Sequence, residues 1–114
     1  MRYRGSCHCG KVTLEFEGNI DGAVSCNCSI CSKRGSLLWF TARSAVQVNG
    51  EGELATYTFN KHKIKHRFCK TCGVLPYGEA MDPQGNLGIA INIRVLDDFD
   101  FTQVPVHPYD GKSA

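Results

Sequence analysis

The chain has 114 residues, a formal net charge of +2, and an ordinary content of 42% hydrophobic and 21% charged residues. A chain of this length and composition is expected to fold as one domain, residues 1–114, with a core of its own. The small net charge argues against a general affinity for polyanions such as nucleic acids. The longest apolar run, residues 37–40, is too short to cross a membrane. Residues 1–5 lead straight into a cysteine cluster without an apolar leader, so we expect a cytoplasmic protein.

Alternation of apolar and polar residues, the pattern of a β-strand, recurs along the first half of the chain. It predicts a first strand over residues 11–17, with the even-numbered side chains in the core. The apolar run at residues 37–40 predicts a strand buried on both faces. Two valines alternate in residues 46–48 and are followed by Asn49-Gly50, a pair that suits a hairpin turn into a strand over residues 53–59.

The most regular alternation lies in the second half of the chain, and it predicts a strand with one apolar face made of Leu87, Ile89, Ile91, Ile93 and Val95. Residues 95–99 can form one helical turn, and a convincing helical stripe of ten residues or more is missing from the sequence. The tail, residues 102–114, contains two prolines and a glycine and is expected to be irregular or to lie at a sheet edge. The chain is therefore predicted to be mainly β.

All seven cysteines fall into three tight clusters, which are Cys7-His8-Cys9, Cys26-Asn27-Cys28-Ser29-Ile30-Cys31 and Cys69-Lys70-Thr71-Cys72. Thiols spaced one or two residues apart can surround one small soft cation, whereas disulfides between such near neighbours close strained rings. Clustered cysteines in a cytosolic chain indicate metal binding. The odd total predicts one complete site of four thiolates and one incomplete site of three.

Glycine distinguishes the clusters, because Gly10 and Gly73 directly follow the last cysteine of the first and third clusters. Glycine adopts a positive φ without steric cost, and such a turn can point backbone N–H groups at the sulfurs. We therefore pair these two clusters around one metal, with Cys7, Cys9, Cys69 and Cys72 as ligands. A rival pairing joins Cys28 and Cys31 with Cys69 and Cys72. Zinc is the default metal for four thiolates, and iron is the alternative.

The middle cluster, Cys26, Cys28 and Cys31, allows two interpretations. In the first, it is a second structural zinc site that is completed by one of the histidines His62, His66 and His107, whereas His8 lies close to the first site. In the second, its fourth position is left to water or to a substrate thiol, as in catalytic zinc sites.

Residues 61–67 predict a strand with a row of basic side chains on one face, Lys61, Lys63, Lys65 and Arg67. A solvated strand face that discourages edge pairing explains this row better than nucleic-acid binding, because aromatic stacking residues do not accompany it. Binding of a small anion stays open, because Arg67 and Lys70 flank a metal-ligand candidate.

The three clusters in their order resemble the glutathione-dependent formaldehyde-activating enzyme family, which also includes centromere protein V. The matching stretches are residues 5–12, 26–31 and 68–73, with further similar positions at residues 91–94, 96–97 and 109–113. The resemblance implies an Mss4-like fold of several coiled antiparallel β-sheets. It also implies a structural zinc at Cys7, Cys9, Cys69 and Cys72, and a catalytic or exchangeable zinc at Cys26, Cys28 and Cys31. The named enzyme joins glutathione and formaldehyde to S-hydroxymethylglutathione, and the reaction is classed as a carbon–sulfur lyase.

Two hypotheses follow from the sequence. The first is a zinc-dependent carbon–sulfur lyase that acts on a small thiol, such as glutathione, and a small aldehyde, with Cys26, Cys28 and Cys31 holding the catalytic zinc. The alternative is a non-enzymatic, zinc-stabilised binding module, which predicts a fourth protein ligand at the middle cluster.

Overall fold

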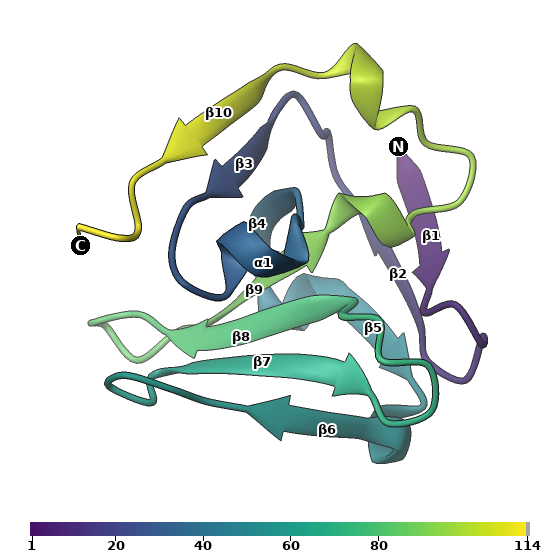
Figure 1. Ribbon diagram of the computed structural model, residues 1–114. Helices are drawn as coiled ribbons and strands as arrows, with labels where there is room; N and C mark the ends of the chain where they lie inside the picture. Colours follow the sequence, from purple (N-terminus) through teal and green to yellow (C-terminus); the bar gives the residue numbers. More distant parts are fainter. Residues whose placement is uncertain (114) are drawn as a thin grey trace.

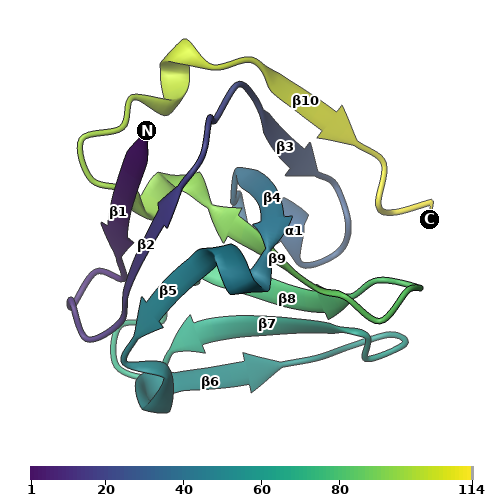
Figure 2. The same ribbon diagram turned by 180° about the vertical axis from the view of Figure 1, so that it is seen from behind.

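Two β-sheets form the framework of the protein in the computed structural model, which describes residues 1–113 (Figure 1). The smaller sheet has the strand order β1-β2-β5, with both pairs antiparallel. Its strands are β1 (Arg2–Ser6), β2 (Thr13–Glu17) and β5 (Val46–Asn49). Figure 2 shows β5 from behind, beside β2.

The larger sheet has seven strands in the order β10-β3-β4-β9-β8-β7-β6. They are β3 (Ala23–Cys26), β4 (Leu38–Ala42), β6 (Leu54–Tyr57), β7 (Ile64–Cys69), β8 (Tyr77–Met81), β9 (Leu87–Asn92) and β10 (Val106–Tyr109). Its neighbours are antiparallel except at one edge, where β10 runs parallel to β3. The sheets are therefore antiparallel, as expected, apart from this one edge pair.

Helical structure is limited in the described part of the chain to α1 (Cys31–Arg34) and four 3-10 turns at Arg43–Ala45, Glu51–Glu53, Ile93–Val95 and Phe101–Gln103. The prediction of a mainly β protein is confirmed. The turn expected at residues 95–99 lies two residues earlier. Asn92 explains the shift, because its side chain accepts a hydrogen bond from the N–H of Arg94 and ends β9 there.

The core joins the two sheets through aromatic rings. Phe16 on β2 stacks on Tyr3 of β1 and on Trp39 of β4, with ring centroids 5.3 Å apart in both pairs. The even-numbered residues of the first predicted strand, Val12, Leu14 and Phe16, are at most 2% exposed, as the alternation predicts. Burying a side chain such as Phe16 contributes about 1.5–3 kcal/mol to folding.

The regular alternation at residues 87–95 is confirmed for the centre of the predicted strand. Ile89, Ile91 and Ile93 are buried, although the strand ends at Asn92 and Leu87 is 40% exposed. The two-sided burial predicted for residues 37–40 is wrong, because Leu37 is buried but Phe40 is 56% exposed. One face of β4 is not covered by another layer at Phe40, which borders a cavity instead.

The predicted hairpin turn at Asn49-Gly50 is wrong. Gly50 does have a positive φ of 86°, but β5 continues into a 3-10 turn and pairs with β2. The next strand, β6, pairs with β7 in the other sheet. The turn residues therefore send the chain from one sheet to the other.

The basic strand predicted over residues 61–67 begins only at Ile64, because Asn60 and His62 have positive φ values and form the turn before β7. Its last member, Arg67, is paired with Glu79 at 3.0 Å. The prediction of four cations in a row on one strand face is therefore wrong, because Lys61 and Lys63 lie before the strand.

The tail forms β10 at the edge of the larger sheet, as its prolines predict, and Ala114 lies outside the described residues. None of the helices within residues 1–113 is long and apolar enough to cross a membrane.

Candidate metal centres

The structure brings four thiols together from two distant parts of the chain. Cys7 and Cys9 lie in the loop between β1 and β2, and Cys69 and Cys72 lie at the end of β7 and in the turn that follows it (Figure 1). All four Sγ atoms lie within 4.8 Å of one another, with 3.6 Å between Cys7 and Cys9 and 3.5 Å between Cys9 and Cys69. Zinc–sulfur bonds of about 2.3 Å in a tetrahedron put sulfurs about 3.8 Å apart, so this group fits a four-thiolate metal site.

The glycines after the two cysteine pairs have the positive φ that the sequence predicts, 82° at Gly10 and 80° at Gly73. These turns aim the next N–H group at a sulfur. The N–H groups of Val74 and Cys9 lower the pKa of Cys72 to about 6. The N–H of Lys11 also lowers the pKa of Cys9, but burial and the neighbouring thiols raise it to about 11. Four thiols this close do not all ionise without a cation among them, which is the condition that a bound metal relieves.

The middle cluster forms where β3 ends and α1 begins. Cys26 is the last residue of β3, Cys31 is the first of α1, and their Sγ atoms lie within 4.8 Å of each other and of Cys28. The N–H of Cys28 points at the sulfur of Cys26 at 3.4 Å, and the N–H of Cys31 points at Cys28 at 3.5 Å. Burial, followed by the adjacent Cys28 thiol, raises the pKa of Cys31 to about 12. Burial also raises the pKa of Cys28, but the N–H of Cys31 and the neighbouring thiols lower it on balance.

No histidine, aspartate, glutamate or further cysteine of residues 1–113 joins these three sulfurs within 4.8 Å. The histidines that the sequence offered as a fourth ligand, His62, His66 and His107, therefore lie outside the cluster. The rival pairing of Cys28 and Cys31 with Cys69 and Cys72 is not brought together either. The donor set of the middle cluster is three thiols, and a tetrahedral ion bound there would have one position left for another ligand.

The C-terminal segment packs directly on the middle cluster, which the sequence alone did not reveal. A Cβ on Gly111 would lie 2.5 Å from the sulfur of Cys26, so only glycine fits this contact. Asn27 holds the segment in place, because its side-chain NH₂ donates to Asp110 at 3.0 Å and its carbonyl oxygen accepts from the N–H of Lys112 at 2.9 Å. Residues 109–113 are among the positions that resemble the family. Their contact with the middle cluster depends on the parallel pairing of β10 with β3, which the sequence did not predict.

A cavity of about 700 Å³ opens beside the middle cluster and not beside the first cluster. Cys26, Cys28 and Cys31 form one wall of it, and the faces of β4, β8 and β9 form much of the rest. Most of the other lining side chains are apolar, and they include Val24, Leu38, Phe40, Phe59, Ile64, Ile89 and Tyr109. A cavity of this size and character is typical of a small-molecule binding site.

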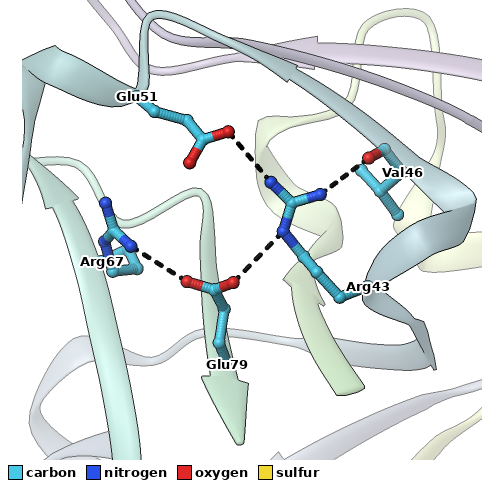
Figure 3. Close-up of polar contacts among 5 residues, drawn as sticks. All are labelled: Arg43, Val46, Glu51, Arg67 and Glu79. Carbon is cyan, nitrogen blue, oxygen red and sulfur yellow. Dashed lines mark hydrogen bonds and ion pairs between the residues drawn. The ribbon is translucent and has the colours of Figure 1, made fainter. Parts of the chain in front are cut away.

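Glu79 is the acidic residue in the cavity wall, and two arginines already neutralise it (Figure 3). Arg43 donates to one carboxylate oxygen at 3.2 Å and Arg67 donates to the other at 3.0 Å. Arg43 also binds Glu51 at 3.1 Å, and Lys70 donates to the carbonyl of Gly52 at 3.2 Å. Arg67 and Lys70, the two cations considered for a small anion, are therefore engaged within the protein.

A mainly β fold that gathers seven cysteines into a group of four and a group of three defines a cysteine-rich protein whose two clusters can bind metal ions. The chain belongs to the glutathione-dependent formaldehyde-activating enzyme family, whose sequence pattern matches residues 2–110. This result confirms the resemblance seen in the cysteine motifs and the Mss4-like fold expected from it.

A solved structure of a Rhodobacter sphaeroides protein, determined by a structural genomics programme, is similar to this chain. The two sequences are 31% identical, and the structures superpose with a TM-score of 0.75. The match covers 91% of this chain and 99% of that protein, so the similarity extends over both folds.

Proposed function

We propose that the protein joins a small thiol, such as glutathione, to formaldehyde or another small aldehyde at the middle cluster, as a zinc-dependent carbon–sulfur lyase. One observation carries the proposal: three thiols without a fourth protein ligand face a cavity, while the complete group of four lies away from it. The first group then holds a structural zinc, and Cys26, Cys28 and Cys31 hold a catalytic one.

The reaction is an addition that needs neither an oxidant nor a reductant. The thiol sulfur forms a bond to the carbonyl carbon, the carbon–oxygen double bond becomes a single bond, and the thiol proton ends on the oxygen. Zinc, when bound by the three thiolates, supplies the positive charge that keeps an incoming thiol ionised at neutral pH.

The residues of the chain prepare the place where the two reactants meet. Arg34 lies one turn of α1 after Cys31 and lines the same cavity, so its charge favours a thiolate there. The apolar side chains around the cavity exclude water from the carbonyl. Gly111 packs on Cys26 and shields that sulfur on the side of the C-terminal segment.

The test uses the zinc-loaded protein with glutathione and formaldehyde, and it follows formation and exchange of the adduct by NMR. We expect faster exchange than in the protein-free mixture, loss of the acceleration in Cys28→Ser, and no loss in Ser32→Ala, a matched control on the exposed side of α1. A rate equal to that of the protein-free mixture would refute the proposal.

The alternative, a non-enzymatic zinc-stabilised binding module, expects a closed middle site, and the basic strand predicted over residues 61–67 is one reason to consider it. Within residues 1–113 the middle cluster has no fourth ligand of the expected kinds, and the basic strand is interrupted. We therefore favour the enzyme. Seven free thiols also suit a reducing compartment, and we propose that the protein acts in the cytoplasm.

A further inference from the structure

The cavity beside the middle cluster displays apolar side chains that nothing in the described structure covers. Phe40 and Ile64, from β4 and β7, line it and are 56% and 50% exposed. Tyr109, on the edge strand β10, lines it as well and is 54% exposed. Large exposed apolar side chains around one cavity are typical of a binding site for an apolar ligand.

The same cavity has an excess of positive charge. Arg34, Lys61 and Lys63 line it, and none of the three forms an ion pair with another residue of the described chain. Its one acidic lining residue, Glu79, is shared between Arg43 and Arg67. The three unpaired cations therefore favour a ligand with a negative charge.

A buried histidine adds a polar group without a partner. His66 lines the cavity, is 9% exposed and stacks on Phe59 with ring centroids 5.4 Å apart. Its Nε2 atom is buried and has no hydrogen-bond partner among residues 1–113. Buried polar atoms are normally satisfied, so an unsatisfied one in a cavity wall indicates a position where a ligand supplies the missing partner.

We propose that this cavity binds an amphipathic carboxylate, a free small acid whose apolar chain lies against Phe40 and Ile64 and whose carboxylate faces Arg34, Lys61 and Lys63. This inference rests on the proposed function: the acid forms the non-reacting part of the thiol or of the aldehyde that reacts at the middle cluster. Glutathione is polar along its whole length and formaldehyde has no apolar body. Neither of them uses the apolar wall, and the amphipathic acid does.

The test measures binding to the zinc-loaded protein by titration calorimetry, with butanoate, hexanoate and octanoate as thiol-free probes. Each buried methylene strengthens hydrophobic binding about fourfold, so octanoate should bind far more tightly than butanoate. Octanol should bind more weakly than octanoate, and octylamine should bind most weakly. Equal affinities for butanoate and octanoate, or octylamine as the tightest ligand, would overturn the proposal.

Two pairs of variants distinguish the contribution of the apolar side chains to binding from that of the cations. Lys63→Gln should weaken octanoate about fivefold and leave octanol unchanged, and Lys65→Gln, an exposed cation outside the cavity, should change neither. Ile64→Ser should weaken both ligands, whereas Met81→Ser, at a residue that is 62% exposed and outside the cavity, should weaken neither. If octanoate bound only through the metal, Lys63→Gln would leave its affinity unchanged. An unchanged affinity would therefore refute the assigned carboxylate position.

The outcomes distinguish this inference from the proposed function. Tight octanoate binding without adduct formation from any thiol and aldehyde refutes the proposed lyase and supports the ligand class. Adduct formation with glutathione and formaldehyde but without octanoate binding supports the lyase and refutes the ligand class.

Discussion

Serine substitutions in the two cysteine clusters should have unequal effects on stability. The first cluster joins the loop after β1 to the end of β7, and the sulfurs of Cys9 and Cys69 meet across 60 positions of sequence. The middle cluster joins residues within six positions, from Cys26 to Cys31. We therefore expect Cys72→Ser to destabilise the zinc-loaded protein much more than Cys28→Ser.

The expected difference follows from the chain length that each cross-link closes. A link across about 60 residues restricts the unfolded chain by about 4 kcal/mol, whereas a link across about six residues restricts it by about 2 kcal/mol. The difference of about 2 kcal/mol corresponds to about 8 °C in Tm for a domain of this length. Burial of Cys7 and Cys69 at the first cluster, 1% and 0% exposed, adds to the loss when this cluster opens.

Differential scanning calorimetry of the two variants and the parent protein, each with its zinc content measured, checks this prediction. A mild chelator should also remove metal from the middle cluster first, without unfolding the protein, because three thiolates hold an ion less firmly than four. Equal losses of Tm in the two variants, or simultaneous loss of both metals with unfolding, would show that the clusters do not differ in this way.

Three further predictions concern stability and oxidation. Glu79→Gln should lower the free energy of unfolding by about 3 kcal/mol in urea titrations, because it leaves the largely buried Arg67 without a carboxylate partner and Arg43 with Glu51 alone. Gly73→Ala should lower it by about 1–2 kcal/mol through the positive φ of 80° alone, since a Cβ there meets no atom within 4 Å. In chelator-treated protein, Cys28 and Cys31 should form a disulfide before the first cluster oxidises, and alkylation followed by mass spectrometry detects it.

Matched controls accompany these variants. Glu15→Gln removes a carboxylate that binds two arginines at the surface, and it should change stability much less than Glu79→Gln. Gly52→Ala should not destabilise the protein. Gly52 does not have a positive φ, and a Cβ there would meet no atom within 4 Å. An equal effect of the two glutamine variants, or of the two alanine variants, contradicts the explanation given for that pair. Simultaneous oxidation of all seven cysteines contradicts the third prediction.

Sequence periodicity predicted which residues face the core better than it predicted which strands pair. The even-numbered residues of 11–17 are buried because their alternation is a local property of the strand. The turn residues Asn49-Gly50 are also where a bend occurs, but β5 pairs with β2 and leaves β6 to the other sheet. The alternation within a strand does not indicate which other strand it pairs with. The hairpin between β5 and β6 was therefore predicted wrongly.

The candidate site shows the same division between local and distant information. The positive φ values of Gly10 and Gly73 follow from their place after a cysteine, and they were predicted correctly. The contacts of Asn27 with Asp110 and Lys112 cross 83 and 85 positions and depend on the parallel edge pair. The cavity itself arises from β4, β8 and β9 together, and a single strand pattern does not contain it.

The packing of Gly111 on Cys26 has a consequence for the order in which the protein matures on the ribosome. All four thiols of the first cluster have been synthesised once Cys72 is added, but the segment that closes over the middle cluster arrives about forty residues later. At about 5–20 residues per second, this interval is about 2–8 s. During it, the nascent chain presents Cys26 without its cover, so metal loading and accidental oxidation compete there before the last strand docks.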